Sequence, residues 1–167
     1  MTRRSRSERR WEHALPSICI EIAIRCLLVG LFLPFSALDK LLNFRQAVGQ
    51  AAHAIPSLLG SKALIVCGFC IEVSMSAAIL TGIADRLAAL VLAFYCVATA
   101  LLWKQFWKAP DFNLRGVSRG RDTFWDFLKN LAVAGGFLLL AFGPAAAGVQ
   151  AFLRHPLAST HPYLMGI

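Results

Sequence analysis

Histidine is scarce in this chain and is missing from its long apolar stretches. The 167 residues include four histidines, and all of them lie between or beyond those stretches: His13, His53, His155 and His161. This placement excludes a haem held by two histidines inside a helical bundle, and it argues against a dense metal site. The sequence also lacks a phosphate-binding glycine loop, a dinucleotide-binding fingerprint and a Ser-His-Asp pattern on a suitable scaffold. No metal and no nucleotide chemistry are therefore indicated.

Charged residues are also few, at 16% of the chain, whereas 57% of the residues are hydrophobic. Long apolar runs explain this composition, and they cover residues 17–38, 63–84, 87–103 and 130–153. Each run is long enough to cross a bilayer, which takes roughly 20 residues of helix. None of them alternates apolar and polar residues, as membrane strands do. The sequence therefore predicts an all-α polytopic membrane protein, an antiparallel bundle of four transmembrane helices.

One membrane domain is expected, at residues 17–153, between a basic N-terminal tail at 1–16 and a C-terminal tail at 154–167. The expected helices of this domain lie at about 17–43, 62–82, 86–107 and 127–152. The basic tail would suit a secretory signal. However, the first apolar run is longer than a signal core and three more runs follow, so we interpret it as a retained helix.

The net charge of +8 does not indicate nucleic acid as a partner, because the basic residues lie at the borders of the apolar runs. Basic residues at such borders set the topology of a membrane protein or contact anionic lipid. They are equally numerous on the two sides of the predicted bundle, so their count leaves the orientation open. Since the first helix usually dominates, we place both termini in the cytoplasm.

Two charged residues lie deep in predicted helices, Arg25 in the first and Glu72 in the second. A charge at such a depth is costly without a partner and marks a candidate functional residue. From the helical rise, Arg25 lies about 12 Å and Glu72 about 16 Å below the same membrane face. We therefore expect a buried Arg25–Glu72 pair between the two helices. The alternative is a pair within the first helix, between Arg25 and Glu21, with Glu72 protonated.

The same topology brings the ends of helices 1 and 3 and the starts of helices 2 and 4 to the opposite membrane face. The candidate residues there for binding a quinone or a protein partner are Asp39, Lys40, Asn43, Trp103, Phe106, Trp107, Lys129 and Asn130. An aromatic belt with lysines that reach the headgroups explains any one of them. Together, aromatic, cationic and amide groups in a concave cluster suit a lipid-soluble headgroup such as a quinone.

Cys67 and Cys70 have the spacing of a redox dithiol and share one face of the second predicted helix. The geometry inside a helix is awkward for a disulfide, and apolar surroundings blunt the reactivity of a thiol. Cysteine is also a common small packing residue. Packing is therefore the favoured role of this pair, and redox chemistry the alternative.

Short motifs in residues 22–140 carry a resemblance to a known family. They are Arg25 with Gly30-Leu-Phe-Leu-Pro-Phe, then Asp39-Lys-Leu-Leu-Asn-Phe, Glu72, Thr81-Gly, Arg86-Leu-Ala-Ala, Phe106-Trp and Phe127-Leu-Lys-Asn-Leu-Ala. In this order and spacing, the chain resembles the DoxX-like family of small four-helix integral membrane proteins. One departure is Ser36-Ala37-Leu38, where relatives often place a glycine shortly before the lysine.

The resemblance implies a four-helix bundle, but it does not fix the chemistry. Some members look like membrane subunits of oxidoreductases, with thiosulfate:quinone oxidoreductase as the namesake case. Others are linked to thiol or oxidative-stress systems, or to the assembly of partner proteins.

The first hypothesis is accordingly an integral membrane subunit of a redox system, with quinone as the candidate cofactor and a soluble or membrane oxidoreductase as its partner. The alternative is a non-catalytic accessory protein that assists the assembly or maturation of a partner. The expected location is the bacterial cytoplasmic (inner) membrane, in contact with the lipid bilayer. Whether the protein is catalytic, and whether it forms a homo-oligomer, stay open.

Overall fold

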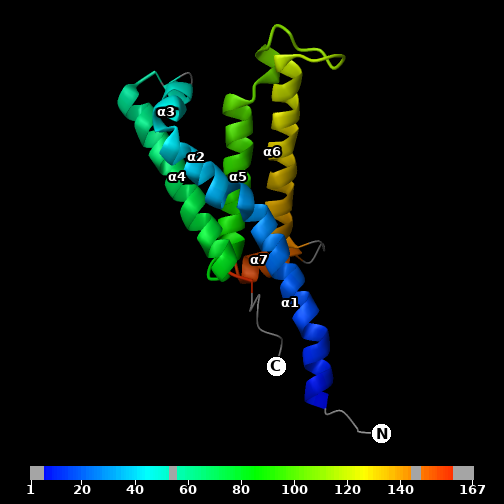
Figure 1. The fold of residues 1–167 in the computed structure, drawn as a ribbon. Helices are drawn as coiled ribbons and strands as arrows, with labels where there is room; N and C mark the ends of the chain where they lie inside the picture. The colour runs from blue at the N-terminus through cyan, green and yellow to red at the C-terminus, as the bar shows by residue number, and fades with distance from the viewer. Residues whose placement is uncertain (1–5, 53–55, 144–147, 160–167) are drawn as a thin grey trace.

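The computed structural model describes residues 6–52, 56–143 and 148–159. All regular structure in these ranges is helical. The segments that are long and apolar enough to cross a membrane are Ile18–Leu42, Leu58–Thr81, Asp85–Lys108 and Arg119–Phe142. The predicted all-α membrane protein with four spans is thus confirmed (Figure 1).

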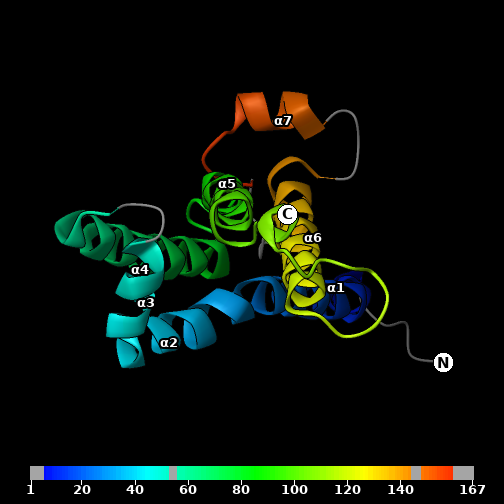
Figure 2. The same cartoon turned by 90° about the horizontal axis from the view of Figure 1, so that it is seen from above.

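The first span bends at Pro34, which lacks a backbone N–H and whose ring clashes with the preceding turn. Helix α1 (Arg6–Gly30) passes into a π-helical turn, η1 (Leu31–Ser36), and then into α2 (Ala37–Leu42). Within the turn, Leu33 has φ −88° and ψ 37°, outside the helical region. After this bend, α2 lies beside α4 rather than beside α6 (Figure 2).

Helix α1 begins at Arg6, so most of the predicted basic tail is helical. After the first span, the short helix α3 (Phe44–Ala52) packs on α4 through Val48 and Ala51. Residues 53–55, which follow this helix, lie outside the described residues.

A short turn joins the second span to the third. Helix α4 (Leu58–Thr81) is capped at its N-terminus by Ser57, whose hydroxyl accepts a hydrogen bond from the Gly60 N–H at 3.3 Å. It ends at Gly82, whose φ of 73° is in the left-handed region that favours glycine. Helix α5 (Asp85–Trp103) follows after three residues, and the turn η2 (Phe106–Lys108) completes the third span.

The core lies where α1, α4, α5 and α6 meet. Its buried members include Val29, Phe32, Ile79, Leu92 and Phe137. Besides Asp85 and Leu92, the face that α5 buries is built from alanines and Cys96, and such small side chains let membrane helices approach closely. Helices α5 and α6 run side by side in both views, whereas α4 leans away from them towards α3 (Figures 1 and 2).

The fourth span occupies Arg119–Phe142 (α6), not about 127–152 as the apolar run suggested. Its charged first turns are stabilised by capping: the Ser118 hydroxyl accepts from the Arg121 N–H at 3.1 Å. The Asp111 carboxylate accepts from two further N–H groups at the start of the helix. At its other end α6 stops at Gly143, which has a φ of 77°, and the chain continues in the short helix α7 (Gly148–Arg154).

We expect Gly120→Ala to destabilise the protein by about 1–3 kcal/mol, as overpacking does. An added Cβ would lie 2.8 Å from the Cα of Phe112 and 3.0 Å from the Cβ of Ala109. Thermal unfolding in detergent micelles measures the effect. Gly135→Ala is the matched control on the same helix, because its Cβ would meet nothing within 4 Å. Equal melting temperatures for Gly120→Ala and Gly135→Ala would contradict the close packing of the segment from Ala109 to Phe112 against Gly120.

Candidate functional site

Helix α4 buries a face that carries polar groups through the membrane span. Its buried residues are Ser61, Gly68, Glu72, Ser76 and Ile79. The spacings of seven, four, four and three residues are those of one helix face. Two groups of charged side chains contact this face. We call them the Lys40 cluster (Ser36, Lys40, Glu72 and Tyr95) and the Arg25 cluster (Glu21, Arg25, Asp85 and Ser159).

The Lys40 cluster is centred on the carboxylate of Glu72, which is 1% exposed. The Lys40 ammonium donates to both carboxylate oxygens, at 2.7 and 2.8 Å, and to the Ser36 hydroxyl at 2.7 Å. The Tyr95 hydroxyl donates to Oε1 of Glu72 at 2.7 Å. A buried carboxylate thus holds two donors that come from different elements, α2 and α5. Charge-assisted hydrogen bonds of this kind are the stronger ones in proteins.

Local features of the sequence allow this arrangement. The bend at Pro34 turns α2 so that Lys40 and Ser36, one turn apart, reach α4 together. Gly68 lies one turn before Glu72, and a Cβ at that position would be 3.0 Å from the Tyr95 hydroxyl. The absence of a side chain at Gly68 therefore makes room for the tyrosine. The ring of Phe32 packs edge-on against Tyr95, with the centroids 6.3 Å apart.

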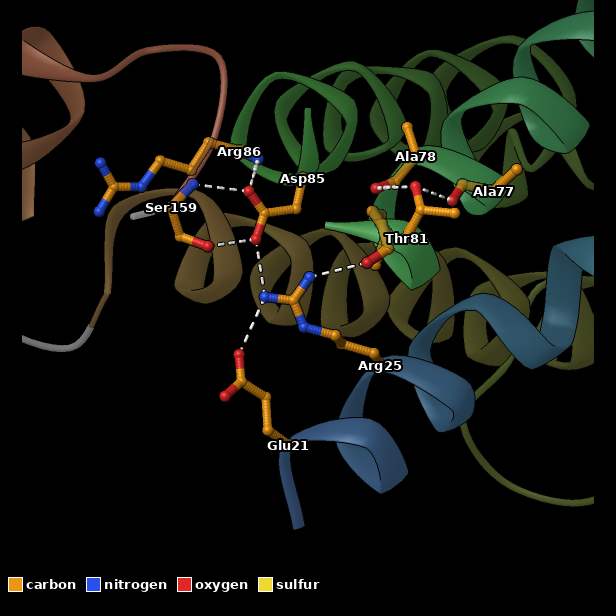
Figure 3. Close-up of polar contacts among 9 residues, drawn as sticks. Glu21, Arg25, Ala77, Ala78, Thr81, Asp85, Arg86 and Ser159 are labelled. Atoms are coloured by element: carbon orange, nitrogen blue, oxygen red, sulfur yellow. Dashed lines mark hydrogen bonds and ion pairs between the residues drawn. The ribbon is translucent and has the colours of Figure 1, made fainter. Parts of the chain in front are cut away.

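The Arg25 cluster lies where α4 ends and α5 begins (Figure 3). The Arg25 guanidinium donates to Asp85 at 2.7 Å, to Glu21 at 3.0 Å and to the carbonyl of Ile79 at 2.7 Å. Arg25 is 1% exposed and Asp85 is fully buried, whereas the Glu21 side chain is 39% exposed. The cluster is therefore enclosed by protein on the side of Asp85 and partly exposed on the side of Glu21.

The segment after α7 completes the Arg25 cluster. Ser159 donates to Asp85 twice, from its hydroxyl to Oδ2 and from its backbone N–H to Oδ1, the latter at 2.7 Å (Figure 3). Arg86 holds the same segment by donating to the carbonyls of Ala151, at 2.9 Å, and His155, at 3.2 Å. Residues 148–159 are thereby fastened to the start of α5, and they cover the Asp85 carboxylate.

The buried pair expected between Arg25 and Glu72 is not the one that the described residues form. Arg25 pairs with Asp85 and with Glu21, and Glu72 pairs with Lys40. The contact with Glu21, which was the alternative, is present. The depth argument did not consider Asp85, which is the buried first residue of α5. It also could not anticipate that the bend at Pro34 would bring Lys40 to Glu72.

The residues predicted to converge at one membrane border fall into two groups. Asp39, Lys40 and Asn43 belong to the region of α2 and α4, and the Asn43 amide donates to Asp39 at 2.7 Å. The others, Trp103, Phe106, Trp107, Lys129 and Asn130, lie where α5, η2 and α6 meet. The two groups lie on different parts of the bundle (Figures 1 and 2).

The second group surrounds Phe106 and Asp126. The Phe106 ring contacts those of Trp107, Phe112, Phe124 and Phe127, with centroid distances of 5.0 to 5.4 Å. The Asp126 carboxylate pairs with Lys104 at 3.0 Å and with Lys129 at 3.5 Å. The Asn130 amide donates to the Asp126 carbonyl at 3.0 Å. This border is therefore an ordered aromatic and charged surface, with Trp107 half exposed.

Four members of the clusters were missed from the sequence: Ser36, Tyr95, Asp85 and Ser159. Tyr95 is one of two tyrosines in the chain and lies in an apolar run without charges, which is a signal that could have been used. Asp85 starts a helix immediately after a turn, a common position for an exposed cap, so its burial left no mark in the sequence. Nothing in the sequence around Ser159 indicates that it contacts Asp85. Cys67 and Cys70 are exposed free thiols on α4, and both the favoured packing role and the redox alternative stay predictions.

A family model, DoxX, matches residues 21–105, about half of the chain. The matched range contains Arg25, Lys40, Glu72, Asp85 and Tyr95, and it ends before α6. No match was found among curated proteins or among solved structures.

Proposed function

The chain belongs to the DoxX family of integral membrane proteins, and from this premise we propose that it is the membrane subunit of a redox system that binds a quinone headgroup at the Lys40 cluster. The supporting observation is the Glu72 carboxylate, which lies inside a membrane span and receives hydrogen bonds from both Lys40 and Tyr95. Ionisable residues within membrane spans are costly and usually serve function.

The chemistry of the cluster suits a quinone. The two carbonyl oxygens of a quinone accept hydrogen bonds, and the Lys40 ammonium and the Tyr95 hydroxyl can donate to them by giving up hydrogen bonds that they make to Glu72. Reduction of a quinone by two electrons consumes two protons, and Glu72 is a carboxyl group that can carry a proton to the site. The rings of Tyr95 and Phe32 add the aromatic surface that quinone sites need.

In this proposal a quinone reaches the Lys40 cluster from the lipid phase. The Lys40 side chain is 16% exposed, whereas that of Glu72 is 2% exposed. A lipid-soluble ligand therefore meets the lysine first, and the carboxylate lies behind it. This order of burial suits a quinone that enters from the bilayer, with its headgroup directed at Lys40.

The electrons come from a protein partner in this proposal, either a soluble or a membrane oxidoreductase. The border around Phe106 and Asp126 is the surface we assign to that partner, because it combines the half-exposed Trp107 with the charges of Lys104, Asp126 and Lys129. Aromatic residues with charges around them are typical of protein interfaces. We place the protein in the bacterial cytoplasmic membrane with both termini in the cytoplasm.

Binding of ubiquinone-1, a short-chain quinone, to the full-length protein in lipid nanodiscs tests the site. We expect Tyr95→Phe to weaken binding about tenfold, the value of one hydrogen bond of roughly 1.5 kcal/mol. The control is Lys129→Met, which removes an exposed ammonium at the other border and leaves the affinity unchanged. Titration calorimetry gives the dissociation constants. Wild-type protein that neither retains quinone on purification nor binds ubiquinone-1 would refute the proposal.

A second function is favoured by a different observation. Among the described residues, both buried carboxylates, Glu72 and Asp85, are fully engaged by donors of the protein itself. A bundle that is locked in this way also suits a non-catalytic accessory protein that assists the assembly of a partner. In that case Glu72→Gln lowers the cellular level of the partner, while the wild-type protein binds no ubiquinone-1.

A further inference from the structure

Helix α7 lies across the bundle rather than along it, beside the ends of α5 and α6 (Figures 1 and 2). Its contacts fix its level. The ring of Phe152 packs against that of Phe142, the last residue of α6, with the centroids 4.9 Å apart. Arg86, which donates to carbonyls at the end of α7, is the second residue of α5. Helix α7 therefore lies where the third span begins and the fourth ends, at one border of the membrane.

Contacts of the backbone fasten residues 148–159 to the bundle at several points. The Leu87 N–H donates to the carbonyl of Leu157 at 3.3 Å, in addition to the hydrogen bonds made by Arg86 and Ser159. At the start of α7, a side chain in place of Gly148 would overlap the carbonyl of Phe142, so the two backbones touch there. Nevertheless, no residue of α7, which the structure describes in full, is buried.

The large apolar side chains of this segment are exposed. Val149, Leu153 and Leu157 are each more than half exposed, and the first two are four residues apart, so they share a face of α7. Gln150 and Arg154 have the same spacing and form a polar face beside it. An apolar face next to a polar, basic one is typical of helices that lie in the plane of a bilayer surface.

We propose that α7 docks on the lipid bilayer, with Val149, Leu153 and Leu157 inserted at the boundary between headgroups and acyl chains. Interfacial helices bury their apolar face about 5–10 Å into this boundary, and the level of α7 beside the span ends places it there. Ile83 and Leu87, which are exposed at the same level, continue the apolar surface of the spans towards α7. The charge of Arg154 complements anionic headgroups.

Docking on lipid has a consequence for the Arg25 cluster. Ser159, which covers the Asp85 carboxylate, comes five residues after the end of α7. Because α7 buries none of its residues in the bundle, the bilayer supplies the apolar contact that holds the helix in place. The bilayer thereby helps to keep Ser159 on Asp85. This role is independent of quinone binding.

The first test measures what surrounds Leu153 in the full-length protein in lipid nanodiscs. A nitroxide is attached to Leu153→Cys after the exposed native cysteines are replaced by serine. Its collisions with oxygen, which concentrates in lipid, and with a water-soluble nickel chelate are then compared. The references are Leu139→Cys on the exposed face of α6 and Leu114→Cys in the loop before α6. We expect oxygen to reach position 153 as it reaches position 139, and the chelate to reach it far less than position 114. Frequent collisions with the chelate, or few with either reagent, would overturn the proposal, since they indicate water or a covering protein.

The second test is hydrogen exchange of the Leu87 and Ser159 amides, which are bonded to Leu157 and Asp85. We expect Leu153→Asp in nanodiscs to speed their exchange on the order of tenfold, which corresponds to about 1.4 kcal/mol of lost docking energy. Leu153→Phe stays apolar and keeps the wild-type exchange. Val117→Asp, at an exposed apolar position at the other end of the bundle, is the matched control. Exchange in Leu153→Asp as slow as in Val117→Asp would overturn the link between docking and the Arg25 cluster.

Discussion

Arg25→Met is expected to lower the free energy of unfolding by about 3–5 kcal/mol, the usual effect of removing one partner from a buried ion pair. The variant leaves the Asp85 carboxylate fully buried without its counter-charge, and among the described residues the donors that remain on it are Ser159 and the Arg86 N–H. The carbonyl of Ile79 also loses the hydrogen bond from Arg25. Unfolding in mixed detergent micelles, followed by circular dichroism, measures the loss.

Two further variants make this result specific to the pair. Arg45→Met removes an exposed arginine from α3 and should leave the unfolding curve unchanged. Asp85→Asn in the Arg25→Met background removes the uncompensated charge while it keeps an acceptor for Ser159. We expect this double variant to recover more than half of the loss. If Arg25→Met were no less stable than Arg45→Met, the Arg25 cluster would not hold the helices together.

Glu72→Gln is expected to destabilise the protein by a comparable amount, about 3–5 kcal/mol, because the Lys40 ammonium loses the negative charge beside it. The glutamine keeps the size of the side chain and still offers an oxygen to Tyr95, so the loss reports the charge and not a cavity. The same unfolding measurement applies. Asp39→Asn is the control, since it removes an exposed carboxylate from the same region without effect.

Combining Lys40→Met with Glu72→Gln separates stability from function. The double variant has no unpaired charge, so we expect it to regain most of the stability. It nevertheless lacks the ammonium that would bind a quinone carbonyl and the carboxylate that would accept a proton. A double variant that is stable and still binds ubiquinone-1 with wild-type affinity would remove the Lys40 cluster from the proposed quinone site.

The spans could be predicted because length and apolar composition decide them, whereas the ion pairs depend on geometry that the sequence does not state. Arg25 and Glu72 were recognised as buried charges from their position in apolar runs. Their partners depend on the angle of the bend at Pro34 and on the burial of Asp85, both of which follow from packing. The bounds of α6 were misjudged because hydropathy ignored its capped and charged first turns and the stop at Gly143.

The motif Asp39-Lys40 also shows which contacts can be predicted from the order of residues along the chain and which cannot. The resemblance placed it among functional residues, and the structure joins Lys40 to Glu72 across 32 positions. The motif does not lie beside Lys129 and Trp107. The prediction that it would do so assumed that all four helices are straight and closely aligned. A bent first span and a leaning α4 separate the two groups (Figure 2).

The contacts of Asp85 set the order in which the Arg25 cluster is completed during synthesis of the chain. Arg25 enters the bilayer with the first span, and Asp85 follows 60 positions later. Ser159 follows Asp85 by another 74 positions. Until α5 is made, Arg25 lacks the Asp85 carboxylate and has Glu21 as its partner on the same helix. The Asp85 carboxylate is covered only when residues 148–159 arrive, so the Arg25 cluster is completed by the last segment that the structure describes.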